Sequence, residues 1–570
     1  MAPPATGRRA PTSCFSCRRS KRRCDKSIPA CQLCSRRGWN CTYPQRRGQR
    51  PTSPIENTRG IEYPSPISAA ANGPARTAPI SVPGSGPGNA ISARSSQSQL
   101  QFPSIPPSFT SRTAISFLAP TLLREASLDT PRLDWDIPPE IALHLGDRPQ
   151  MRAATAAFFQ LTRSWMSIVS PRRHLAAVLN PLSSCRRPTA LLALCMRLCC
   201  LPVSSNEADG GGGGVVERIA LYRLVKRFYA EVESTEGLCL QVLQAAVLIA
   251  VFEIGDAIYP AAYLTVGACA RYGIAMGLDQ VNKDRMGGAS GIGTGTGAVS
   301  WMDIEERRRV WWGVLILDRF LNVANPARSL ATEDPAFDDF LPVDDDKFYD
   351  ATATSKDADT ISQGFTYKIG QFQRLAQATY LLSQVLVTIR SSPTNPNSNR
   401  TDTSIISTDT AQLCRTLDAL VRANEIDATV RKLAFCCQSL VSFSGILLLQ
   451  THHWTQLSTH SPTDAARHTF SETHNAFDTL YRIALFLQQG SEMQDLLRGQ
   501  CTFFLASVVY QAISALLTIG RGDPDAAVRE RERVEALRWL LGHLGGRWVV
   551  SGVYLSILDA KEALLAAEAI

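Results

Sequence analysis

Six cysteines near the N-terminus have the residue type and the spacing to bind metal. They lie within 28 residues and repeat the unit C-x2-C-x6-C: Cys14, Cys17, Cys24, Cys31, Cys34 and Cys41. A C-x2-C pair can present two thiolates to one tetrahedral zinc ion. Because two tetrahedral ions need eight sulfur positions, six thiolates suffice only if two of them bridge both metals.

The duplication makes Cys14 and Cys31 equivalent positions, and it predicts that they are the bridging pair. One ion would then be held by Cys14, Cys17, Cys24 and Cys31, and the other by Cys31, Cys34, Cys41 and Cys14. Two Zn²⁺ ions and six thiolates leave a charge of −2, which neighbouring Lys and Arg side chains can offset. A disulfide framework is the alternative. Residues 1–13 contain no apolar core of a secretory signal, which favours zinc.

The cysteines lie in a strongly basic segment. Residues 1–50 hold 13 Lys or Arg and a single acid, Asp25, a charge of +12, whereas the other 520 residues sum to −4. A cationic head on a mildly acidic body favours a polyanion such as double-stranded DNA as partner. From charge alone, a basic tail that only aids solubility is an equal alternative.

The segment CFSCRRSKRRCDKSIPACQLCSRRGWNCTYP resembles the binuclear zinc cluster of fungal transcription factors. The resemblance implies a domain at residues 10–47 with two short helices, each beginning at a C-x2-C, and with Pro29 in the loop between them. It also implies that Lys21, on a helix in the major groove, donates to guanine in a CGG-type triplet. The other expected DNA contacts are basic: Arg18, Arg19, Arg22, Arg23, Arg36 and Arg37. Ser20 departs from the family pattern, in which a basic residue often precedes this Lys, so the triplet preference can differ.

Residues 48–112 are predicted to be a disordered linker. Twelve of the 33 prolines lie between residue 44 and about residue 112, among many Ser, Gly and Gln, and such a segment cannot bury enough apolar area to offset the entropy of ordering. Prolines also interrupt any heptad repeat directly after the basic head. Pairing with a second copy or with another transcription factor is therefore left open.

Beyond the linker, helical periodicity predicts a large all-α domain at residues 113–570. One apolar stripe is formed by Leu221, Leu224, Val225, Phe228 and Val232. Comparable segments lie near 152–167, 188–200, 238–253, 261–277, 303–323, 364–390, 408–423, 431–451, 465–489, 497–519 and 525–544. The uncharged segment 501–520 is long enough to span a membrane, but its polar residues and helical surroundings favour a buried core helix, and no membrane partner is expected. The glycine-rich segments 210–214 and 287–297 are predicted to be loops.

The segment EERRRVWW at 305–312 resembles a landmark of the fungal transcription factor regulatory domain. Ser300 and Asp303 predict a capping box, and Glu305 is placed to pair with Arg309 one turn later. The spacing also predicts that Arg308 stacks on Trp312. Trp311 and Trp312 are interpreted as core residues, with contact to a small-molecule effector as the alternative. The acid-rich segment 333–350 is either an activation segment or an ordinary surface loop.

Catalytic motifs such as HExxH or GxSxG are not evident, and an enzyme is not expected. The sequence predicts a nuclear, sequence-specific transcription factor for RNA polymerase II genes, with the transcription machinery among its partners. By resemblance, its targets would belong to a metabolic or secondary-metabolite gene cluster. The alternative is a helical ligand-binding protein or enzyme with a zinc-stabilised basic appendage.

Overall fold

The computed structural model describes residues 10–19, 22–38, 41–43, 114, 117–118, 136–180, 185–203, 213–285, 300–363, 369–391, 400–431, 436–457, 462–489, 501–520 and 524–568. The chain divides into two compact units, Met1–Ser98 and Gln99–Ile570. The predicted linker at 48–112 and the glycine-rich segment 287–297 lie outside the described ranges. Gly213 and Gly214 begin a helix, so the loop predicted at 210–214 is wrong for these two residues.

The first unit contains two short helices, α1 (Phe15–Arg19) and α2 (Gln32–Arg37). Each begins directly after the first cysteine of a C-x2-C pair, as the family resemblance implies. α2 ends at Gly38, whose φ of 62° is the left-handed conformation that glycine adopts without strain. Pro29 lies in the loop between the two helices.

The second unit is built from helices, and no strand occurs among its described residues apart from an isolated antiparallel bridge between Phe340 and Thr360. Its first helices are α5 (Pro139–Leu145), α6 (Arg148–Thr162), α7 (Pro171–Leu179), α8 (Arg187–Cys200), α9 (Gly213–Thr235), α10 (Leu240–Gly255), α11 (Ala261–Ala275), α12 (Trp301–Val323) and α13 (Asp345–Tyr349). Then follow α14 (Gln371–Ser391), α15 (Arg400–Arg431), α16 (Cys437–Leu457), α17 (Pro462–Gln488), α19 (Phe503–Gly520), α20 (Pro524–Arg529), α21 (Arg531–Leu544) and α22 (Val550–Glu568). The prediction of a large all-α domain is confirmed.

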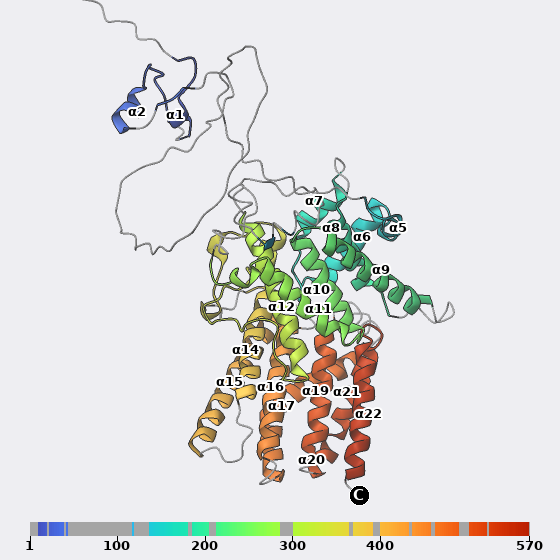
Figure 1. The fold of residues 1–570 in the computed structure, drawn as a ribbon. Helices are drawn as coiled ribbons and strands as arrows, with labels where there is room; N and C mark the ends of the chain where they lie inside the picture. Colours follow the sequence, from blue (N-terminus) through green and yellow to red (C-terminus); the bar gives the residue numbers. More distant parts are fainter. Residues whose placement is uncertain are drawn as a thin grey trace, which may run out of the picture. The chain divides into compact units, whose positions relative to one another are not determined.

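The helices of the second unit form two groups joined through α12. In the first group, α8 packs against α6, α9 and α10, and α10 also packs against α11. In the second, α14 to α17, α19, α21 and α22 run roughly along one direction (Figure 1), with α16 and α19 in contact at the centre. α12 contacts α10 and α11 on one side and α14 on the other, so its residues help to fix the two groups together.

The apolar segment predicted as a core helix forms α19. It is the one described helix long and apolar enough to cross a membrane, and 72% of that window is buried inside the unit. α19 is covered by α16, α17, α21 and α22. Its low polarity is therefore explained by burial among other helices.

The helices differ from the predicted segments at several points. α6 ends at Thr162, whereas periodicity placed the end near 167. The backbone leaves the helix there because the carbonyls of Ser167 and Ile168 accept hydrogen bonds from the side chains of Arg309 and Gln244. The C-terminal helix α22 was not predicted, since its apolar residues follow no narrow stripe.

α12 begins with the predicted capping box between Ser300 and Asp303, and Glu305 pairs with Arg309 at 2.8 Å. Trp312 is fully buried and donates from Nε1 to the Phe340 carbonyl at 3.0 Å, as expected for a core residue. The predicted stacking partner of Arg308 is wrong. Its guanidinium lies over Trp301 at 5.4 Å and over Phe340 at 5.5 Å.

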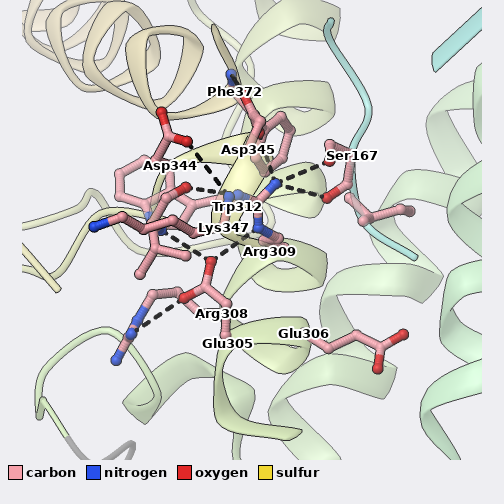
Figure 2. Close-up of polar contacts among 12 residues, drawn as sticks. Ser167, Glu305, Glu306, Arg308, Arg309, Trp312, Asp344, Asp345, Lys347 and Phe372 are labelled. Atoms are coloured by element: carbon pink, nitrogen blue, oxygen red, sulfur yellow. Dashed lines mark hydrogen bonds and ion pairs between the residues drawn. The ribbon is translucent and has the colours of Figure 1, made fainter. Parts of the chain in front are cut away.

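Arg309 is the centre of a buried polar cluster that joins three parts of the chain (Figure 2). Its guanidinium donates to Asp345 at 2.9 Å, to the Ser167 carbonyl at 3.1 Å and to the Val343 carbonyl at 2.6 Å, besides pairing with Glu305. Burial acts against the charge, but the carboxylates of Asp345 and Glu305 outweigh it and raise the pKa of Arg309. Arg309 is therefore held as a cation inside the unit.

This cluster also determines the conformation of the acid-rich segment 333–350. Asp345 is buried and accepts from the backbone N–H of Phe372 at 3.1 Å, in addition to its pair with Arg309. Leu341, Val343 and Phe348 are buried as well. The segment is thus integrated into the helical unit, and its central acid and apolar residues are used in packing.

Candidate metal centre and nucleic-acid interface

The six N-terminal cysteines lie together around one point of the first unit. Cys14, Cys17, Cys31 and Cys34 are fully buried, while Cys24 and Cys41 are half-buried. Sulfur to sulfur distances are 3.8 Å for Cys14 and Cys31, 3.6 Å for Cys17 and Cys31, and 3.9 Å for Cys14 and Cys24. Four sulfurs at about 2.3 Å from a tetrahedral zinc lie about 3.8 Å apart. The spacing of the thiols therefore fits zinc.

The sulfurs fall into two groups of four, each with all members within 4.8 Å of one another. The groups are Cys14, Cys17, Cys24, Cys31 and Cys14, Cys31, Cys34, Cys41. They share Cys14 and Cys31, the two positions that the sequence duplication predicts to be bridging. This geometry fits two ions with two common sulfurs, because two separate sets of four would need two more cysteines than the segment contains.

The shared sulfurs are also equivalent in their hydrogen bonding. Cys14 Sγ accepts from the backbone N–H of Cys17 at 3.4 Å, and Cys31 Sγ accepts from that of Cys34 at 3.4 Å. The N–H of Cys31 points to Cys41 Sγ at 3.2 Å. Such donors favour the thiolate form that a metal requires.

Burial opposes ionisation of the inner cysteines. It raises the pKa of Cys17 and of Cys34 to about 12, and it also raises the pKa of Cys14. At Cys24 and Cys41 burial acts in the same direction, but hydrogen bonds from backbone N–H groups outweigh it and lower the pKa. Six thiolates at neutral pH therefore call for a strongly positive partner, which divalent metal ions supply.

Two residues outside the cysteine pattern hold the frame of the cluster. Asp25, the one acid of the segment, accepts from the backbone N–H of Gln32 at 3.0 Å and so satisfies a free donor at the start of α2. The hydroxyl of Tyr43 donates to the Ser27 carbonyl at 2.7 Å and ties the end of the segment to the loop. Neither residue was assigned a role from the sequence. A structural role for Asp25 could have been inferred from its position, because it is the one acid among the 13 basic residues of residues 1–50.

The described basic residues surround the cluster on its outside. Arg18 on α1, Arg22 and Arg23 after it, and Arg36 and Arg37 in the last turn of α2 are all exposed. Lys21 and the side chain of Arg19 lie outside the described part of the chain. The helix that was expected to carry Lys21 does not extend to Cys24.

α1 ends at Arg19, so Arg22 and Arg23 follow it in non-helical backbone. The physical reason is that the chain must turn back after α1, because the sulfur of Cys24 lies 3.9 Å from the sulfur of Cys14. Arg22 remains tied to the helix end through its N–H, which donates to the Cys17 carbonyl at 3.0 Å. Cations therefore project both from helices and from the adjoining loop.

Comparisons with known proteins match both units. The fungal Zn(2)-Cys(6) binuclear cluster domain matches residues 12–50, and the fungal specific transcription factor domain matches residues 158–422. Transcription factor BOA15 of Botryotinia fuckeliana (strain B05.10) is 38% identical over 152 residues, which are 27% of this chain and 76% of that protein. A thiamine biosynthesis regulatory protein of Saccharomyces cerevisiae (strain ATCC 204508 / S288c) is 51% identical over 41 residues, 7% of this chain and 9% of that protein. No solved structure matches the chain.

Proposed function

This chain belongs to the fungal Zn(2)-Cys(6) transcription factors, and on that premise we propose that its cluster holds two zinc ions and reads a CGG-type triplet in DNA. The six cysteines would be the ligands, with Cys14 and Cys31 bridging. Zinc would hold the six thiolates in a fixed arrangement, and the chain's own basic residues would supply the surface that meets DNA. The family is one of transcription factors rather than of enzymes.

The observation that supports DNA recognition most directly is the placement of cations on two helices held by one set of sulfurs. Arg18 on α1 and Arg36 on α2 are exposed while the cysteines of the same helices are buried. A rigid basic surface of this kind fits the phosphates of a groove. The proposed base reader is Lys21, four residues after Cys17.

The full chain with zinc is expected to prefer a duplex that contains the triplet over one in which the triplet is altered. Each mismatched base pair should cost about 1–3 kcal/mol of binding free energy. Fluorescence anisotropy at a fixed salt concentration measures this difference. Equal affinity for every duplex would leave the proposal without support.

Lys21→Ala is expected to weaken binding to the preferred triplet by about 1–3 kcal/mol and to relax the preference among triplets. The reason is the loss of a donor to guanine O6 and N7. Binding to a library of randomised duplexes measures both effects. An unchanged preference in this variant would refute the assignment of Lys21.

Arg36→Ala is expected to weaken binding to all duplexes alike. A phosphate contact carries no sequence information, and its loss should reduce the slope of log affinity against log salt by about one. Gln32→Ala, an exposed and uncharged position on the same helix, is the matched control and should leave the slope unchanged. A loss confined to one triplet would instead make Arg36 a base contact.

A single zinc cluster covers a short DNA site, so useful specificity requires a second DNA-binding domain, either from another copy of this chain or from another transcription factor. We propose that the protein acts in the nucleus on RNA polymerase II genes together with the transcription machinery. The basic runs 18–23 and 46–50 would also serve nuclear import. Metabolic or secondary-metabolite genes are the proposed targets. Mapping of bound genomic sites, with transcript changes after deletion, tests this assignment.

A further inference from the structure

A pocket opens in the second unit between α5, α6 and α8, which lie grouped at the same end of that unit as α7 (Figure 1). Its volume is about 290 Å³, close to the lower end of the range of about 300–1,000 Å³ for small-molecule sites. The lining residues come from the three helices: His144 and Leu145; Gln150, Met151, Ala153 and Ala154; Ala193, Leu194 and Arg197. The pocket is far along the chain from the cysteine cluster and takes no part in the function proposed above.

One side of the pocket is formed by α8, a helix that is otherwise almost entirely buried. From Arg187 to Cys199, every residue of α8 is buried except Arg197, which is half-buried at the pocket. The space above it exists because Ala153, Ala154 and Ala193 present only methyl groups. The guanidinium of Arg197, on a helix that is otherwise buried from Arg187 to Cys199, is therefore accessible from a pocket lined in part by alanines.

Apart from the His144 ring, whose nitrogens can donate or accept, the polar side-chain groups that remain available in the pocket are donors. One N–H of the Arg197 guanidinium donates to the His144 carbonyl, which orients the group and leaves its other N–H groups. The side-chain oxygen of Gln150 accepts from the backbone N–H of Asp147 at 3.0 Å, so this amide has its NH2 group left to offer. Among the described residues, no carboxylate pairs with Arg197, and none of the lining side chains is acidic.

We propose that this pocket binds a small monocarboxylate with a short apolar body. The carboxylate would accept from Arg197, with Gln150 as a second donor, and charge-assisted hydrogen bonds of this kind are among the strong ones. The apolar body would lie against Leu145, Met151 and Leu194. A second carboxylate on the ligand would compete for the same guanidinium, and an ammonium group would find no acidic side chain among the lining residues, which disfavours dicarboxylates and amino acids.

The structure also argues against the effector site considered from sequence. Trp312 is fully buried, and Trp311 is only 5% exposed. Neither residue lines the pocket between α5, α6 and α8. A ligand of the second unit is therefore expected at Arg197 and not at the two tryptophans of α12.

The test uses the full zinc-loaded chain and three probes: butanoate, hexanoate and benzoate, with hexanamide as the neutral counterpart of hexanoate. Calorimetric titration should show saturable binding of at least one acid, at about millimolar affinity for ligands of this size. Hexanamide should bind at least about tenfold more weakly than hexanoate, because it lacks the charge. Equal affinity of acid and amide would overturn the carboxylate assignment.

Three variants locate the site. Arg197→Gln should weaken binding of the acid by about 10-fold to 100-fold. Arg197→Lys, which keeps the charge, should retain part of the affinity for the acid. Ala153→Leu should abolish binding by filling the pocket, and Ala156→Leu, at an exposed position of α6 outside the pocket, is the matched control.

Thermal melts establish that each variant is folded, and the melting temperature with and without the acid gives a second readout of binding. The inference is overturned if no acid binds more tightly to the unaltered chain than to Arg197→Gln, or if Ala153→Leu binds as the unaltered chain does. Zinc content and DNA affinity, measured in the same preparations, show separately whether the proposed function holds.

Discussion

Cys31→Ser is expected to remove the tight binding of both zinc ions, whereas Cys41→Ser should leave one ion bound as tightly as before. Cys31 belongs to both groups of four sulfurs, and Cys41 belongs to one of them. Loss of the shared sulfur leaves each ion with three protein ligands, while loss of the terminal one affects a single ion. Structural zinc sites contribute an apparent binding free energy of about 10–16 kcal/mol, so the effect should be large.

Competition with a chelator of known affinity, followed by metal analysis, counts the tightly held ions in each variant. Specific DNA binding should be lost with Cys31→Ser, because α1 and α2 would no longer be held together. Cys185→Ser, a half-buried cysteine of the second unit, is the control and should keep both ions. If Cys31→Ser and Cys41→Ser retained the same number of tight ions, Cys31 would not be a bridging ligand.

The cluster could be predicted from sequence because its chemistry is local. All six cysteines lie within 28 residues, and the repeated spacing limits how their sulfurs can meet. The structure brings the sulfurs into the two predicted groups, although their role as zinc ligands stays a prediction. Hydrogen bonds that cross the segment, such as those of Asp25 and Tyr43, could not be inferred, since nothing in the spacing shows which backbone groups need partners.

In the second unit, helix type was predictable and helix partners were not. The period of apolar residues identifies amphipathic helices such as α9, and the pair of Glu305 and Arg309 follows from a spacing of four residues. The other contacts of Arg309 lie far away in the sequence, at Ser167 and Asp345. Such contacts depend on how helices pack, and they explain why the end of α6 and the order of the acid-rich segment were missed.

Arg309→Met is expected to destabilise the second unit by about 3–5 kcal/mol, because it leaves the buried carboxylate of Asp345 without a cation and that of Glu305 with Arg308 alone, at 3.5 Å. Arg309 is fully buried, and its guanidinium lies 4.1 Å from the ring centre of Phe348. Methionine keeps the length and the apolar contacts of the side chain, so the loss reports the charge and its hydrogen bonds. Chemical denaturation of the full chain, followed by tryptophan fluorescence, measures the change for this unit.

Arg163→Met is the matched control, because Arg163 pairs with Asp346, the residue next to Asp345, at 2.7 Å. In that pair the side chains are 56% and 66% exposed, and an exposed ion pair contributes about 0–1 kcal/mol. A similar small loss for Arg309→Met would mean that water reaches the cluster and that the three segments are held by apolar packing alone. A large loss that Asp345→Asn relieves in the double variant would instead show that the stranded carboxylate is the source of the cost.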